Sequence, residues 1–536
     1  MSKEITMVRH ARLDRRALIA RAAALGLAAP FAASGLATRG IALAAQDGGK
    51  TVVAAIPQAT VQLDPAVAGS NGYGDIIPLA DNITEGLTRF RQGSAEIEPA
   101  LAESWDVSED GLTYTFHIRP GVTFHDGTPV DAKAVELNYL RQFDPDHPLH
   151  NDGMVYAPIV FADVEKIEAT GDMDLTITMT KPSILLPGNL AIFAAGILSP
   201  KALEEKGADV GQSPVGTGPF RFDSWTKDVE LVLVANDDYW DGRPALDRVV
   251  WRTIPEDTVR LSELKTGGID IANQVDFKDT DEIENDPNLA LVTGPFFNTQ
   301  YLALNGAQAP FDNVTVRKAV QHAINKQNIA DAVFYGRYVL GAGPIAPELI
   351  GYDADLAGVY QYDPEKAKSL LAEAGAGEIV FDLYNRPNSF WPIVGQLIQA
   401  DLATVGITAN IKMMEDAEFF DALNKGEAPA FINDWTWDNG DPDNIMYPLF
   451  SSPNTINRLG YKNEQVDELV SQGAVTADPD KRWEIYGEAQ QLILDDAIMV
   501  ILGYPERAIG TSNKVQDLVI SPVGALPLGK VDLASS

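Results

Sequence analysis

The sequence predicts an α/β fold with mixed sheets, and three observations support this prediction. Residues 112–118 and several later segments alternate apolar with polar side chains, which is the period-2 pattern of half-buried strands. From about residue 300 onward, amphipathic helical patterns alternate with strand patterns. The chain has no internal repeat and no low-complexity linker. We therefore expect structural units that are joined by packed strands.

The individual elements follow in chain order. Three of the expected helices begin with a capping aspartate, namely Asp131, Asp363 and Asp478. In the last two, Pro364 and Pro479 take the first helical position. A fourth helix covers 394–405 and ends at Gly406. The expected strands are 112–118, 175–179, 229–234, 249–253, 407–413 and 498–502. The last of them is apolar throughout, which indicates a strand covered on both faces.

Composition excludes several classes of function. The 536 residues hold 41 Lys and Arg against 76 Asp and Glu, for a net charge of −35, and no cysteine. Without cysteine there is no disulfide framework, zinc ribbon, iron–sulfur cluster or thiol nucleophile. Strong acidity argues against nucleic acid and against anionic membranes, because both need clustered Lys and Arg. The length predicts about three structural units.

Residues 1–44 differ from the rest and are predicted to be an export signal. Seven basic residues lie there against two acidic ones, and an Ala-rich stretch follows from Ala17 to about Phe31. Ala42-Leu43-Ala44 offers a small-x-small cleavage site. Arg15-Arg16 before this stretch predicts the twin-arginine route, with an ordinary secretory signal as the alternative. No later stretch approaches the ~18 apolar residues of a membrane span.

Familiar catalytic and cofactor motifs are lacking. The sequence has no G-x-S-x-G, Walker A or H-E-x-x-H motif. Ser262 and Lys265 satisfy S-x-x-K without its companion motifs, and we interpret them as an exposed helix face. Residues 216–219 are interpreted as a turn into a strand, and His147 and His150 as part of a surface loop. We predict no catalytic residue, no bound metal and no cofactor.

The most informative segment is 433–443, which contains Trp435, Trp437 and Asp438 among acids, glycine and proline. Aromatic rings beside a carboxylate suit an organic cation, because the acid supplies charge and the rings supply cation–π attraction. A tryptophan pair in the core at the end of a strand, with an aspartate capping a helix, explains the pattern equally well. Upstream, Arg386 lies in a polar loop between a strand and a helix, where it can grip a carboxylate or simply face solvent.

Several stretches resemble one family along most of the chain. They are Pro99–Gly127, Pro214–Phe220, Asn236–Trp240, Gly268–Asp270, Leu304-Asn305, Pro310–Asn313 and Arg317–Ala319. The chain resembles the extracytoplasmic solute-binding proteins of peptide-type ABC importers, which include dipeptide, oligopeptide and nickel binders, and it is most similar to the dipeptide binders.

This resemblance implies a two-lobed periplasmic binding protein clamshell with an extra subdomain on the first lobe. Lobe I would comprise residues 45–296 and 503–536, with the subdomain inserted at about 90–210. Lobe II would comprise residues 297–502. The chain would cross between lobes near 294–300 and return near 498–504.

The resemblance also implies the binding residues. The aspartate matching Asp438 holds the ligand α-ammonium, and the arginine similar in position to Arg386 takes the ligand carboxylate. The remaining expected ligand-binding residues are Trp435, Trp437, Asn439, Tyr73 and Asn385. Two departures stand out, because Trp437 and Asp434 occupy positions where dipeptide binders tend to have small residues.

The implied function is that of a non-enzymatic, monomeric receptor in the periplasm. It would capture short peptides and deliver them to an inner-membrane permease. An opine, a modified amino acid, an oligosaccharide or a chelated metal are alternative ligands. A secreted hydrolase that uses Asp438 and Asp441 is the alternative from another class.

Overall fold

The computed structural model describes residues 49–68, 73–387, 390–452, 454 and 458–534. The predicted export signal lies outside these residues. Val52–Ser536 forms one compact unit. The helices and strands named below lie in its described part, except that β1 begins one residue earlier, at Thr51. No helix in the described part of the chain is long and apolar enough to cross a bilayer.

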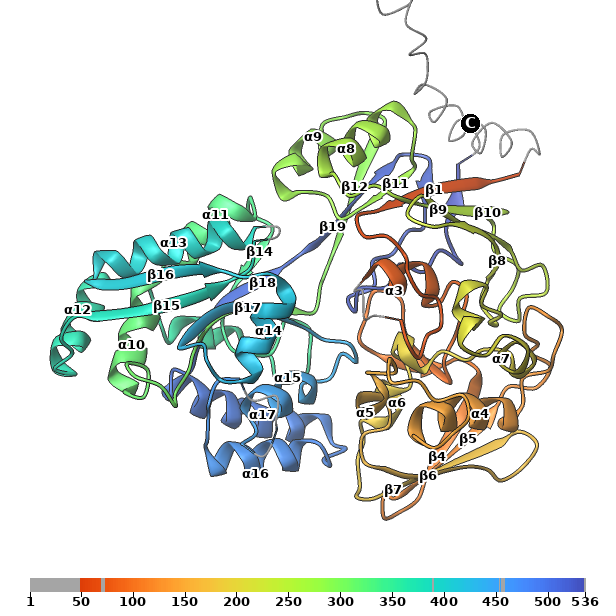
Figure 1. Cartoon of the computed structure of the whole chain (residues 1–536), viewed down its shortest axis with the longest axis horizontal. Helices are drawn as coiled ribbons and strands as arrows, with labels where there is room; N and C mark the ends of the chain where they lie inside the picture. The colour runs from red at the N-terminus through yellow and green to blue at the C-terminus, as the bar shows by residue number, and fades with distance from the viewer. Residues whose placement is uncertain (1–48, 69–72, 388–389, 453, 455–457, 535–536) are drawn as a thin grey trace, which may run out of the picture. The chain divides into compact units, whose positions relative to one another are not determined.

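A seven-stranded mixed sheet gathers strands from both ends of the chain (Figure 1). The pairing of β1 with β11 is parallel, whereas β19 is antiparallel to both of its neighbours. In spatial order the strands are β12 (Leu289–Gly294), β19 (Arg507–Ser512), β11 (Ile271–Asn273), β1 (Thr51–Ile56), β10 (Arg248–Thr253), β9 (Glu230–Ala235) and β8 (Phe220–Thr226). The helices that lie between β1 and β12 in the sequence include α3 (Tyr73–Leu79), α8 (Asp257–Thr266) and α9 (Thr280–Glu284).

A four-stranded antiparallel sheet is built from residues 102–179, in the order β4 (Ala102–Val107), β5 (Thr113–Ile118), β7 (Asp174–Met179) and β6 (Val164–Ala169). The helix α4 (Ala132–Phe143) packs against β6 and β7. A short hairpin of β2 (Thr88–Phe90) and β3 (Ile97–Pro99) precedes this sheet. Three short helices, α5 (Ala157–Val160), α6 (Leu186–Asn189) and α7 (Pro200–Lys206), follow α4 in the chain.

A six-stranded mixed sheet forms the second half of the molecule. Its order is β14 (Tyr338–Leu340), β18 (Met499–Pro505), β13 (Asn298–Leu304), β17 (Ala430–Thr436), β15 (Ile379–Asn385) and β16 (Ile407–Met413). The pairings of β15 with β16 and β17 are parallel and the others are antiparallel. The mixed sheets confirm the predicted fold class.

Both faces of the six-stranded sheet are covered by helices and have separate apolar cores. One core joins alternate residues of β13, such as Leu302, to α10 (Val314–Ala323), α11 (Lys326–Val333), α12 (Pro364–Glu373) and α13 (Trp391–Thr404). The other joins Tyr301 to α14 (Asp416–Asn424), α15 (Asp443–Phe450), α16 (Glu464–Gly473) and α17 (Pro479–Asp495). Every residue of β18 is buried, as its continuous apolar run predicts.

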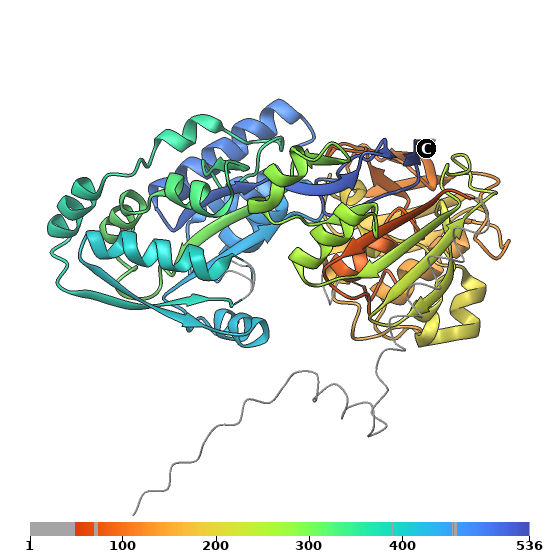
Figure 2. The same ribbon diagram turned by 90° about the horizontal axis from the view of Figure 1, so that it is seen from above.

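The chain passes between the two large sheets twice, and both connections can be followed in Figures 1 and 2. Residues 295–297 lead from β12 to β13, and Glu506 alone separates β18 from β19. Since β12 pairs with β19 and β13 pairs with β18, the two connections lie next to each other.

The local predictions from sequence hold for the named elements. Asp131, Asp363 and Asp478 all cap helices, each accepting a hydrogen bond from a backbone N–H of the first turn. The helix over 394–405 is part of α13, and the six expected strands are β5, β7, β9, β10, β16 and β18. These elements have strong local signals, because caps and periodicity lie within a few residues of each other.

The turn at 216–219 leads into β8, as predicted, and its glycines are required by close packing. A Cβ atom at Gly216 would lie 2.0 Å from the Ile83 carbonyl oxygen, and one at Gly218 would lie 2.5 Å from that of Asn82. Between them, the Thr217 hydroxyl donates to the buried carboxylate of Glu85 at 2.8 Å. The two glycines therefore serve packing and do not form a dinucleotide site.

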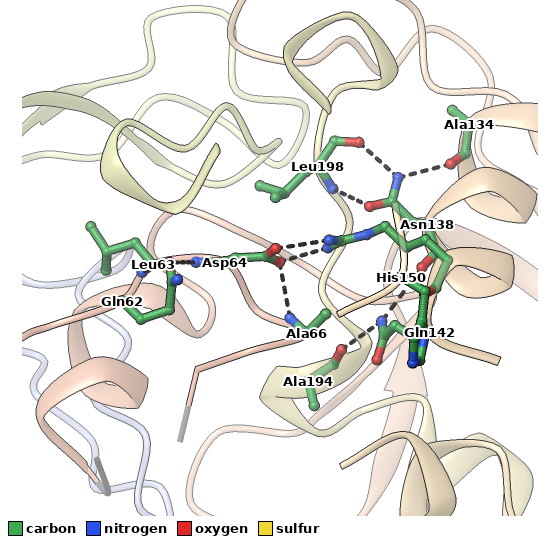
Figure 3. A network of polar contacts seen from close by, with 11 residues as sticks. Gln62, Leu63, Asp64, Ala66, Ala134, Asn138, Gln142, His150, Ala194 and Leu198 are labelled. Atoms are coloured by element: carbon green, nitrogen blue, oxygen red, sulfur yellow. Dashed lines mark hydrogen bonds and ion pairs between the residues drawn. The ribbon is translucent and has the colours of Figure 1, made fainter. Parts of the chain in front are cut away.

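A buried ion pair anchors the segment after β1 to α4 (Figure 3). The Arg141 guanidinium donates to both oxygens of Asp64 at 2.6 and 2.8 Å, and the two side chains are only 2% and 6% exposed. Neighbouring amides complete the network: Asn138 exchanges hydrogen bonds with Leu198, and Gln142 donates to the Ala194 carbonyl.

We expect Asp64→Ala to lower the free energy of unfolding by about 3–5 kcal/mol, because it leaves the Arg141 charge buried without a partner. Urea denaturation at pH 7 measures the change. The control is Glu168→Ala, which removes an exposed partner of Lys166 and should cost at most about 1 kcal/mol. A loss in Asp64→Ala no larger than in this control would contradict the prediction.

Candidate functional site

The strand β17 separates two rows of side chains. Its residues alternate across the sheet, so Asn433 and Trp435 face the core that contains Tyr301 and Phe431. Asp434 and Thr436 face the opposite way and line a cavity. The backbone N–H of Trp437 donates to the Phe297 carbonyl at 2.9 Å, which extends the pairing with β13 one residue beyond the strand.

The cavity has a volume of about 500 Å³, within the range of small-molecule sites. Residues of both large sheets and of the segments that connect them line it. Asn298 and Gln300 lie opposite Thr436 and Asp434 in the register of β13 with β17, and all four line the cavity. The other lining residues with polar or aromatic side chains are Asp257, Gln274, Asp276, Phe277, Lys278, Phe296, Tyr335, Phe390, Glu506 and Arg507.

Asp438 follows two residues after Thr436, just beyond the end of the strand. It is half-buried, and its carboxylate has no hydrogen bond or ion pair with another described residue. Loss of solvation raises the pKa of the Asp438 carboxyl from 3.8 to about 7. The next three residues, 439–441, line a second cavity of about 460 Å³. Asp438 itself lines neither cavity but lies in the chain between residues that line the two, and it has no counter-ion among the described residues.

Arg386 is not free. Its Nη2 donates to Asp434 Oδ1 at 2.8 Å, and its guanidinium lies over the rings of Trp391, Phe419 and Phe420 at 5.2 to 5.7 Å from their centroids. The parallel pairing of β15 with β17 brings the arginine to this place.

Asn385 has a structural role beside this arginine. It is fully buried, and its Nδ2 donates to the Trp391 carbonyl at 2.8 Å. Its Oδ1 accepts from the backbone N–H of Arg386 at 2.9 Å. We therefore assign Asn385 to holding the turn between β15 and α13.

The two tryptophans do not enclose Asp438. Trp437 is fully buried in the core, and its Nε1 donates to Thr299 Oγ1 at 3.3 Å. Trp435 is half-buried against the same core and donates to Asn444 Oδ1 at 2.9 Å. The structure thus favours the second interpretation of the pattern, a core tryptophan pair at the end of a strand.

The remaining two predicted ligand-binding residues are Asn439 and Tyr73. Asn439 is buried, and its Nδ2 donates to Asn189 Oδ1 at 2.8 Å, which ties the segment after Asp438 to α6. Tyr73 begins α3, but its side chain lies outside the described residues.

Asp441 is the partner of Asp438 in the hydrolase alternative, and its carboxylate already forms an ion pair with Arg482. The Arg482 guanidinium donates to both of its oxygens at 2.8 and 2.9 Å. Asp441 also accepts from the backbone N–H of Asp443 at the start of α15. This carboxylate stabilises the turn and is not available for acid–base chemistry.

The remaining motifs are structural, as predicted. Ser262 and Lys265 are exposed on α8, where Lys265 pairs with Glu282. The ring of His147 accepts from the Leu149 N–H, and that of His150 lies 3.1 Å from the Arg141 carbonyl oxygen.

Sequence reasoning missed the lining residues outside 433–443. Asn298 and Gln300 lie in a fully buried strand, and only their register with β17 places them at the cavity. No local pattern marks such positions, because the pairing joins segments more than 130 residues apart.

Comparison with known proteins agrees with this architecture. Residues 96–457 match the model of the bacterial extracellular solute-binding proteins, family 5, middle region. The chain is 34% identical over 462 residues to heme-binding protein A of Haemophilus influenzae, covering 82% of this chain and 84% of the relative. It is 32% identical over 486 residues to the dipeptide-binding protein of Escherichia coli, covering 85% and 89%.

Solved structures show the same fold. The periplasmic binding protein DppA of Helicobacter pylori, in complex with the peptide STSA, matches with a TM-score of 0.79 and 30% identity over 92% of this chain and 100% of its own. The fold is that of periplasmic binding proteins, the non-enzymatic solute receptors of ABC importers. The chain belongs to family 5 of the bacterial extracellular solute-binding proteins.

We expect Asp438→Asn to raise the free energy of unfolding of the ligand-free protein at pH 8 by about 1–2 kcal/mol, since screening by solvent moderates the cost at a half-buried site. The folded state binds the Asp438 proton more tightly than the unfolded state, because its pKa is about 7 against 3.8. The wild-type protein therefore loses stability as the pH rises from about 4 through 7.

Urea denaturation of both proteins at pH 4 and pH 8 measures this effect. The difference should disappear at pH 4, where the aspartate is protonated in the folded state and at least partly so in the unfolded state. An equal difference at both pH values would show that Asp438 is not desolvated.

Proposed function

We propose that this receptor captures short peptides and that Asp438 binds their α-ammonium group. The observation that carries the proposal is the half-buried carboxylate of Asp438, which has no hydrogen bond or ion pair with another described residue. Asp438 lies two residues beyond the end of a strand whose residues Asp434 and Thr436 line the 500 Å³ cavity. A desolvated carboxylate without a counter-ion is costly, and a bound ammonium relieves this cost. Relatives named as dipeptide-binding and di/tripeptide-binding proteins support a peptide ligand.

The proposed mechanism is closure of two lobes around the ligand. The lobes correspond to the parts built on the seven-stranded and six-stranded sheets, and the two connecting segments act as the hinge. Hinge closure around a ligand is the motion of periplasmic binding proteins as a class, and it requires that the ligand bind the closed state better than the open one. The hydrogen bond between Asn439 and Asn189 is a direct contact between the segment next to Asp438 and α6.

The same proposal covers the cellular role. The receptor works as a monomer in the periplasm, reached by the twin-arginine route, and delivers its ligand to the permease of an ABC importer. The strong net negative charge attracts cationic groups at long range.

Asp438→Ala should weaken binding of dipeptides by about 100-fold or more, because loss of one partner of a buried charge pair costs about 3–5 kcal/mol. Isothermal titration calorimetry with a panel of dipeptides and with hemin measures the affinities. Asp480→Asn, on the exposed first turn of α17, is the matched control and should bind as the wild-type protein does. Unchanged affinity in Asp438→Ala would refute the ammonium site, and binding of hemin alone would replace the peptide class.

The affinity should also depend on pH with a maximum between about 7 and 8. Below pH 7 the Asp438 carboxyl becomes protonated, so the dissociation constant rises by up to about tenfold per pH unit. Above about pH 8 the peptide α-amino group loses its proton and binding weakens again. Titrations from pH 5 to 9 test this, and Asp438→Asn should lose the acidic limb of the profile.

A further inference from the structure

The charge of Arg386 is already balanced within the protein. Its Nη2 donates to Asp434 Oδ1 at 2.8 Å, and Asp434 Oδ2 accepts from Asn298 Nδ2 at the same distance. Both oxygens of Asp434 are therefore engaged. A second acid, Asp416, lies 3.9 Å from Nη1.

This pair is held in place from one side and faces the cavity from the other. The Arg386 side chain is 12% exposed and is covered by aromatic rings, whereas Asp434 is 29% exposed and lines the cavity. A molecule in the cavity therefore meets the carboxylate of the pair before the guanidinium. A ligand carboxylate that takes the Arg386 Nη2 would have to displace Asp434 and leave it with Asn298 alone, which is unfavourable for a partly desolvated charge.

The described walls of the cavity offer a ligand carboxylate no basic side chain that is not already engaged. Of the two basic side chains that line it, Lys278 pairs with Asp276, and Arg507 donates to Asn273 Oδ1 and to backbone carbonyls. Acidic side chains outnumber basic ones in the lining, with Asp257, Asp276, Asp434 and Glu506 against Lys278 and Arg507.

We infer that Asp434 is a specificity-determining residue that selects peptide carboxamides over peptides with a free carboxylate. This inference rests on the proposed function, in which Asp438 takes the ammonium end. A carboxamide is neutral, its NH₂ group donates to the carboxylate of Asp434, and its oxygen accepts from a neighbouring donor. The preferred ligand thus carries a net positive charge and is not a zwitterion.

The test compares three dipeptides, Ala-Ala, Ala-Phe and Phe-Ala, each as the free acid and as the carboxamide. Isothermal titration calorimetry at pH 7.5 and physiological salt gives the ratio of the two affinities. The proteins are wild type, Asp434→Ala, Asp434→Asn and the control Asp416→Asn. Asp416 is near the same guanidinium but does not line the cavity, so its variant reports general changes in charge.

We expect the wild-type protein and Asp416→Asn to bind the carboxamides at least about tenfold more tightly than the free acids. In Asp434→Ala, Arg386 is released and the preference should reverse toward the free acids. Asp434→Asn keeps the size and the contact with Asn298 while it removes the charge, and it should also favour the free acids. Thermal unfolding verifies that each variant is folded. If Asp434→Ala does not fold, Asp434→Asn alone tests the inference.

Two results would overturn the inference in different ways. If free acids bind the wild-type protein as tightly as carboxamides and the Asp434 variants do not change the ratio, the inference fails while the peptide receptor stands. If no probe binds any folded variant, the proposed function fails and the inference fails with it.

Discussion

The antiparallel pairing of β13 with β17 determines which side chains of the site face the core and which face the cavity. In a strand, successive residues point to opposite sides, so one register fixes the whole row. Here the register places Asn433, Trp435 and Trp437 on the core side and Asp434 and Thr436 on the cavity side. A slip of one residue would expose the indoles and bury a carboxylate, and the apolar core on one side excludes it.

The site combines two carboxylates in opposite electrostatic situations. Asp434 has a guanidinium and an amide as partners, whereas Asp438 has neither among the described residues and carries a raised pKa. The first arrangement stabilises the empty receptor. The second destabilises it, and in the proposed function the bound ammonium group removes this cost. The difference follows from position, because Asp434 lies next to β15 and its arginine, while Asp438 lies beyond the end of the sheet.

Much of the fold was predictable from local sequence, and less of the site was. Capping residues such as Asp363 and Asp478 and the apolar run of β18 have short-range signals, so their elements were identified correctly. Arg386 follows directly after β15 and pairs with Asp434 of the neighbouring parallel strand β17, 48 positions away, and no local pattern encodes this contact. Trp437 illustrates the same limit, since an indole next to an acid gives the same local pattern whether it faces a ligand or a core.

The adjacency of the two connections between the large sheets has a mechanical consequence. Residues 295–297 join β12 to β13, and Glu506 joins β18 to β19. Because β12 pairs with β19 and β13 pairs with β18, the two connections lie side by side and act as one two-stranded connection. Such a connection lets one sheet bend relative to the other but resists twisting of the two sheets and sliding of one past the other. For the lobe closure proposed above, the two adjacent connections therefore leave mainly one degree of freedom, which is the bending angle between the two sheets.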